Sequence, residues 1–195
     1  YYFTYVVQNT KMVQIVATIT TLVPIVTNLL APFLVKLTTK RNLMIGGSVV
    51  HAGGLLIIFF GGTNVPVLIA GAVIAAAGYG LKGSMHFAMQ PDDYGEWKSG
   101  VNTAGTLSAV NGFIGKVGMA IASSIGAALL QFGGFDASLT AQTTTAQSYI
   151  TTMYIWVPIV MNIATVITML FYNLDKIYPQ IIKELDERRA AECQK

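Results

Sequence analysis

Charge is scarce in this sequence. Asp, Glu, Lys and Arg make up only 11% of the 195 residues, while apolar residues make up 53%. Soluble domains carry about 25% charged residues, so this chain has too few to cover a water-facing surface. The composition therefore excludes an ordinary soluble domain and predicts an all-α bundle of helices that crosses a membrane several times.

Cysteine is almost absent, and the motifs of soluble enzymes are missing. Cys193 is the only cysteine, so neither an internal disulfide nor a CxxC metal site can form. His51 and His86 do not combine with cysteines or acids at metal-binding spacings, and there is no Walker loop or nucleophile elbow. The net charge of +3 is not arranged as a basic stripe interleaved with aromatics. We therefore expect no enzyme, no bound metal or resident cofactor, and no nucleic-acid partner.

Long uncharged runs predict five membrane-spanning helices, since a helix needs about 20 residues to cross a bilayer. Residues 1–8 are interpreted as the partial end of a further helix, so that 1–172 form a transmembrane bundle and 173–195 a charged tail. The chain has no initiator methionine, and we expect it to be the C-terminal part of a longer protein. The five spans lie at roughly 12–37, 43–60, 65–88, 103–131 and 149–172.

Basic residues gather on one side of this topology. The turns at 38–42 and 90–99 and the tail together hold most of the lysines and arginines. Because basic loops stay in the cytoplasm, we place the chain in the cell membrane, the bacterial inner membrane, with these segments and the tail cytoplasmic. The lipid bilayer is thus the first partner expected.

Two of the spans carry stripes of small residues at helical spacing. Such stripes let membrane helices approach each other closely. We therefore predict close helix packing along both stripes, which are Gly71, Ala75 and Gly78 in one span and Gly118, Ala122 and Gly126 in the next.

Lys116 is the only charged residue between Ser99 and Phe135. A charge at the membrane centre costs at least about 2.5–3.5 kcal/mol, and such residues mark substrate or ion pathways. Gly112 lies one helical turn before Lys116, and Ser108 and Asn111 lie near the same face. We assign these four residues to a substrate or coupling pathway. The alternative is a structural lysine that donates to backbone carbonyls or reaches the interface.

Acidic residues are absent from all five predicted spans. A buried ammonium needs a charged or hydrogen-bonded partner, so a carboxylate for Lys116 would have to come from outside this chain. All nine acids lie in predicted loops or in the tail: Asp92, Asp93, Glu96, Asp136, Asp175, Glu184, Asp186, Glu187 and Glu192.

Two further groups could have a functional role. The predicted loop at 90–99 is either a cytoplasmic gate closed by ion pairs or a solvated turn with an aromatic anchor; its candidate residues are Asp92, Asp93, Tyr94, Glu96, Trp97 and Lys98. Tyr79, Lys82 and His86 stand near the cytoplasmic end of one span and form either an inner vestibule or an interfacial polar cluster. His51, alone in an apolar span, is expected to be hydrogen-bonded within the bundle.

Three stretches resemble one known family in order and spacing. The run Asp93-Tyr94-Gly95-Glu96-Trp97-Lys98-Ser99-Gly100 is similar to the signature of the glycoside–pentoside–hexuronide:cation symporters, a branch of the major facilitator superfamily that includes the melibiose carrier. The run Lys116-Val117-Gly118-Met119-Ala120 resembles the K-x-G-x-A of the helix that follows in that family. The run from Phe171 to Pro179 resembles its F-Y-x-L-D-K-x-Y-P end.

The resemblance implies that the chain is the C-terminal six-helix half of a major facilitator superfamily transporter, with helix seven present only as a stub. It implies uptake of a small sugar or glycoside, coupled to Na⁺ or H⁺, by alternating access. Lys116 matches a lysine near the family's coupling and sugar sites. The coupling cation would be bound mainly by the missing N-terminal half. The alternatives are a non-transporting assembly or sensor module of the same fold and, less readily, an intramembrane enzyme.

Overall fold

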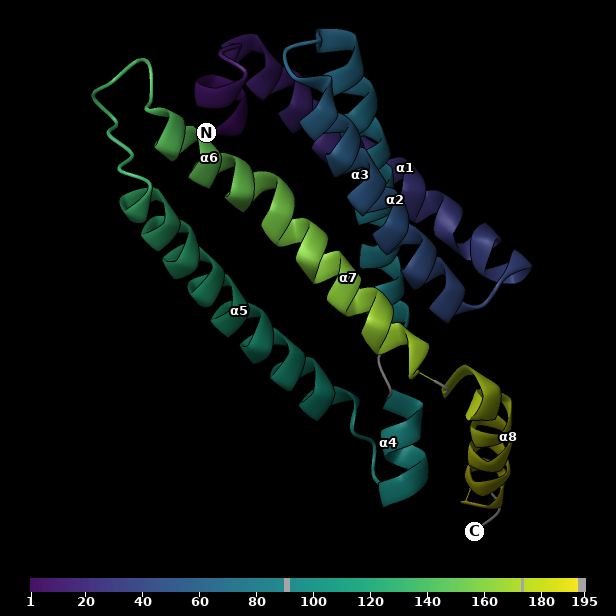
Figure 1. Ribbon diagram of the computed structural model, residues 1–195. Coiled ribbons are helices and arrows are strands. Elements are labelled where there is room, and N and C mark those ends of the chain that lie inside the picture. The colour runs from purple at the N-terminus through teal and green to yellow at the C-terminus, as the bar shows by residue number, and fades with distance from the viewer. Residues whose placement is uncertain (90–91, 173, 193–195) are drawn as a thin grey trace.

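The computed structural model describes residues 1–89, 92–172 and 174–192, and all regular structure in them is helical (Figure 1). The side chains of 92, 175, 176 and 189–192 lie outside this description. The elements, in chain order, are η1 (Tyr2–Val6), α1 (Thr10–Leu37), α2 (Lys40–Gly61), α3 (Val65–Ala88), α4 (Asp92–Ser99), α5 (Ala104–Phe132), α6 (Thr144–Thr151), η2 (Thr152–Trp156), α7 (Val157–Leu170) and α8 (Leu174–Glu192).

Five helical stretches in the described residues are long and apolar enough to cross a membrane: α1, α2, α3, α5 and the continuous run from α6 to α7. The all-α membrane bundle expected from composition is confirmed. One expectation needs correction: the region at 92–99 is a short helix rather than a loop. The predicted tail is helical as well, as α8 from Leu174 to Glu192.

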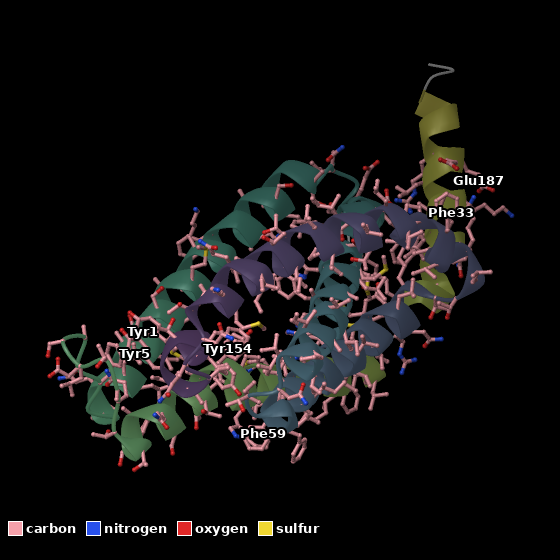
Figure 2. The ribbon with its side chains drawn as sticks, turned by 90° about the horizontal axis from the view of Figure 1, so that it is seen from above. Tyr1, Tyr5, Phe33, Phe59, Tyr154 and Glu187 are labelled. Atoms are coloured by element: carbon pink, nitrogen blue, oxygen red, sulfur yellow. The ribbon has the colours of Figure 1, made fainter. Side chains whose placement is uncertain are left out.

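The two ends of the bundle have different chemistry. Figure 2 shows the labelled Tyr1, Tyr5 and Tyr154 gathered at one end and Phe33 and Glu187 at the other. At the first end, η1 packs into the main apolar core, where the rings of Tyr2 and Tyr154 stack with centroids 4.9 Å apart. At the opposite end lie α4 and α8 (Figure 1).

Basic side chains cap helix ends at the α4 and α8 end of the bundle. Arg41 Nε and Nη2 each donate, at 2.7 Å, to the carbonyl oxygens of Met169 and Leu170 at the end of α7. Lys40 Nζ donates to the carbonyl of Ala88, the last residue of α3, at 2.9 Å. The last carbonyls of a helix lack intrahelical partners and carry partial negative charge, so these cations satisfy them.

Helices α2 and α3 approach each other through glycines. A Cβ at Gly54 would collide with the backbone of Ala75, and a Cβ at Gly78 would collide with the backbone nitrogen of His51. The predicted close packing along Gly71, Ala75 and Gly78 is therefore confirmed.

The second small-residue stripe behaves differently. No residue of α5 is buried, and there is nothing within 4 Å of a Cβ placed at Gly118. The expected packing along Gly118 and Ala122 is wrong for this chain taken alone, because α5 lies beyond α7 and away from α1–α3 (Figure 1). A contact is present only near the helix end, where Gly126 approaches Met153.

The glycine contact makes a testable prediction about stability. We expect Gly78→Ala to lower the free energy of unfolding by about 1–3 kcal/mol, because the added methyl must push α2 away from α3. The measurement is the thermal unfolding midpoint of the purified protein in detergent. Gly83→Ala in the same helix is the matched control, because nothing lies within 4 Å of its Cβ. It should leave the midpoint unchanged or raise it slightly, since alanine is the better helix former. Equal shifts in the two variants would contradict the packing.

Candidate functional site

A cavity of about 490 Å³ lies between α1, α2, α3, η2 and α7. This volume falls within the range of about 300–1,000 Å³ that is typical of small-molecule sites. Most of its lining is apolar, and the polar lining side chains are Thr20, His51, Tyr79, Lys82 and Tyr154.

A cluster of three polar side chains borders this cavity. Lys82 Nζ donates to Asn162 Oδ1 at 2.8 Å and lies 3.0 Å from His51 Nδ1. Asn162 is buried, and its Nδ2 donates to the carbonyl of Pro158 at 2.7 Å, which fixes the orientation of the amide. The three residues come from α3, α2 and α7, so the cluster joins three helices near the middle of α2.

Donor chemistry fixes the hydrogen positions in the cluster. An ammonium can only donate, so Nδ1 of His51 must accept from Lys82 and the ring hydrogen lies on Nε2. The Lys82 ammonium also lies over the ring of Tyr79, 5.6 Å from its centroid, and the His51 and Tyr79 rings meet edge to face at 5.7 Å. The cluster thus positions the Lys82 ammonium by hydrogen bonds, with the rings of His51 and Tyr79 as its aromatic neighbours.

Glycines allow these side chains to meet. Gly78 lies opposite the backbone nitrogen of His51, and a Cβ at Gly47 would lie 3.0 Å from the backbone nitrogen of Lys82. Each helix therefore carries a glycine opposite the polar residue of the other. Their side chains can then reach the same point without separating the helices.

The structure divides the predicted inner vestibule in two. Tyr79 and Lys82 line the cavity described above, together with His51, which is hydrogen-bonded within the bundle as expected. His86 instead lines a second cavity of about 290 Å³, with Asn111 of the predicted pathway group. Lys82 and His86 thus line different cavities, although they lie only one helical turn apart along α3.

Sequence reasoning missed Asn162. It is a primary amide within the apolar run of α7, one turn after Pro158. A polar side chain in a membrane helix is itself a signal, because it needs a partner there. What the sequence does not show is that the partner is 80 residues away, on α3.

The remaining predicted pathway residues lie on the surface of the chain. Lys116 is exposed near the middle of α5, and Ser108 and Gly112 on the same helix are exposed too. Lys116 does not pack against the other helices of this chain, because α5 contacts mainly α4 and α6 at its two ends.

The predicted gate residues lie on α4, which docks against α8. The indole Nε1 of Trp97 donates to Glu184 Oε2 at 2.6 Å, and Arg188 donates back to the Trp97 carbonyl at 2.9 Å. The hydroxyl of Tyr178 donates to the Asp93 carboxylate. We call this set of contacts the α4–α8 contact. It joins α4 to the tail helix α8.

The other described candidates of this group, Tyr94, Glu96 and Lys98, lie on α4 as well. Lys98 lies over the Tyr94 ring, 5.4 Å from its centroid, and Tyr94 in turn lies 5.9 Å from the Trp97 ring. Glu96 is half-buried within α4. The side chain of Asp92 lies outside the described residues.

The similarity of this chain to known proteins identifies its family. Residues 1–176 match the family described as MFS/sugar transport protein. The chain belongs to this family. The match covers all five spans and η1, and it confirms the resemblance found in the sequence, namely part of a sugar transporter of the major facilitator superfamily.

Individual relatives of the MFS/sugar transport family are similar over most of this chain. The isoprimeverose transporter of Lactiplantibacillus pentosus is 32% identical over 98% of the chain and 40% of its own length. The putative sulfoquinovose importer of Escherichia coli is 30% identical over 84% of the chain and 36% of its own length. The glucuronide carrier protein homolog of Escherichia coli is 29% identical over 100% of the chain and 43% of its own length.

The chain thus spans about 40% of the length of these curated relatives. No solved structure matches it. The names of the relatives are those of transporters and not of enzymes. Together with the five membrane-length helices, they identify a multi-pass membrane protein of a transport family.

The α4–α8 contact predicts a pH dependence. The Trp97 indole, followed by the Gln180 amide, holds the pKa of Glu184 below its ordinary value of 4.5. Because the pKa is lowered in the folded state, the contact contributes stability above pH 4.5 and loses it as pH falls through the lowered pKa. We expect a change in Trp97 fluorescence with a midpoint below 4.5, measured in a Trp156→Phe background that leaves Trp97 as the only tryptophan.

Glu184→Gln is the control for this titration, because it keeps the shape of the side chain but removes the titrating carboxylate. The fluorescence change should be absent in that variant. A midpoint above 4.5, or an unchanged titration in Glu184→Gln, would show that Glu184 does not govern the contact.

Proposed function

We propose that the complete protein is a secondary active transporter that carries a sugar or glycoside, coupled to Na⁺ or H⁺, by alternating access. This chain would supply the C-terminal bundle and a preceding half the rest of the pathway. Membership of the MFS/sugar transport family and the names of the relatives support this proposal.

The exposed ammonium on α5 is the observation that carries the proposal. Lys116 lies near the middle of a 29-residue apolar helix in which no residue is buried. An ammonium facing hydrocarbon at that depth is costly, so α5 must face other protein or a water-filled space. A pathway between this bundle and a second bundle satisfies that requirement, and Asn111 of α5 already lines a cavity with His86.

The coupling cation would be bound mainly outside this chain. Residues 1–91 and 137–174, which contain α1, α2, α3 and the run from α6 to α7, include no Asp or Glu. A membrane site for a cation usually uses carboxylates or clustered oxygen atoms. The carboxylates for Na⁺ or H⁺, and a counter-charge for Lys116, would then come from the preceding half.

The α4–α8 contact would act as the gate on the cytoplasmic side. It lies at the same end as the capping residues Lys40 and Arg41, and basic ends of membrane bundles stay in the cytoplasm. Its hydrogen bonds are partly exposed to the exterior, so they can break and re-form as the two halves rock. The tail and this end of the bundle would therefore be cytoplasmic, with the protein in the cell inner membrane.

Replacement of Lys116 tests the proposal. In membrane vesicles that hold the complete transporter, we expect Lys116→Gln to reduce cation-stimulated sugar accumulation by about tenfold or more, because a charged hydrogen bond in the pathway is lost. Lys116→Arg should keep part of the activity. Lys11→Gln is the matched control, because Lys11 is also exposed but lies in the first turn of α1, near the bundle end.

The outcomes separate the hypotheses. Wild-type uptake and wild-type cation dependence in Lys116→Gln would remove Lys116 from the mechanism. No accumulation of any sugar by the unmodified transporter, with either cation, would instead favour a non-transporting assembly or sensor module. The isolated 195-residue chain should show no flux, because one bundle cannot enclose a pathway by itself.

A further inference from the structure

We propose that Lys82, positioned by His51 and Asn162, binds the acidic group of an anionic sugar in the cavity between α1, α2, α3 and α7. The inference rests on the proposed function, since it names the substrate class of that transporter. It is distinct from the pathway role of Lys116, which lies on α5 and does not line this cavity.

The charge balance around Lys82 points to an anion. Its ammonium lies within hydrogen-bond distance of His51 Nδ1 and Asn162 Oδ1, which are both neutral groups. None of the cavity-lining residues in the described part of the chain is acidic, and the helices that form the cavity contain no Asp or Glu at all. A half-buried ammonium among neutral acceptors lacks a counter-charge, and a carboxylate or sulfonate would supply one.

The donors are arranged to accept such a group. An ammonium has three hydrogens, and His51 and Asn162 take two of them, which leaves one for a ligand. Because His51 accepts at Nδ1, its Nε2 carries a hydrogen and provides a second donor on a residue that lines the cavity. The bond from Asn162 to Pro158 holds the amide that positions Lys82. Because the Lys82 ammonium is already positioned, it loses little conformational entropy when an anion binds.

The rest of the cavity suits a sugar ring. Tyr79 and Tyr154 line it, Thr20 offers a hydroxyl, and the volume of about 490 Å³ exceeds that of a monosaccharide. The C–H face of a pyranose packs against aromatic rings while its hydroxyls turn toward polar groups. Lys82 lies 5.6 Å from the centroid of the Tyr79 ring, so an acid at C6 could reach the ammonium while the sugar lies near Tyr79.

A set of three sugars that differ at one position tests this assignment. The probes are methyl glucosides that carry a hydroxyl, a carboxylate or a sulfonate at C6. They compete for uptake by the complete transporter in membrane vesicles. We expect at least one acidic sugar to compete about tenfold more strongly than the neutral one, as a charge-assisted hydrogen bond would give.

Three variants assign that preference to the cluster. Lys82→Gln should reduce the ratio of acidic to neutral affinity by about tenfold, and Lys82→Arg should retain it. Asn162→Asp should also lower the ratio, because it places a competing carboxylate beside Lys82. Lys36→Gln is the control: Lys36 is exposed near the end of α1, outside the cavity, and this variant should keep the wild-type ratio. Membrane abundance and thermal unfolding of each variant are measured in parallel.

Each result decides the proposal. No acidic preference in the unmodified transporter overturns it, and this test does not depend on any variant folding. An acidic preference that survives in a folded Lys82→Gln protein also overturns it. So does an equal loss for all three sugars, which would show that Lys82 pairs with a carboxylate of the protein. If neutral sugars are carried in these cases, the proposed function stands. If no sugar is carried, the proposed function itself fails.

Discussion

Helices α2 and α3 approach each other so closely that a Cβ cannot fit at Gly54 or Gly78. In a membrane, helix association gains little from the hydrophobic effect, because lipid is as apolar as the side chains, and close backbone contact takes its place. The same contact brings His51 and Lys82 within reach of each other, because Gly78 lies opposite His51 and Gly47 lies opposite Lys82. Small residues thus serve both the stability of the bundle and the position of its polar cluster.

The cost of placing charge in lipid explains where the other ionic groups lie. Lys40 and Arg41 satisfy the terminal carbonyls of α3 and α7 at one end of the bundle. Nearby, Asp93 of α4 accepts from the Tyr178 hydroxyl, and Glu184 of α8 accepts from the Trp97 indole. Only Lys82 and Lys116 lie well inside membrane helices. Lys82 has neutral partners within the chain, while Lys116 is exposed on a helix without buried residues, so the two cations need different surroundings in the complete protein.

Much of the fold followed from the sequence, and the reasons can be named. Uncharged runs of membrane length gave the helices, because only helices satisfy all backbone groups in lipid without partners from other segments. The stripe at Gly71 and Gly78 correctly indicated close packing, but the equivalent stripe at Gly118 did not, because packing also needs a partner helix and α5 has few neighbours here. The short helix α4 was missed, since its charged sequence is also typical of a loop.

The sequence by itself determined the class of protein, the number of membrane-length helices, the family and the scarcity of internal charge, because all of these depend on composition and local order. Only the tertiary structure decided which polar residues share a site. It separated His86 from Lys82, joined Lys82 to His51 and to the unnoticed Asn162, and docked α4 on α8. The physical reason is that these contacts link residues tens of positions apart, and their geometry depends on how closely whole helices approach.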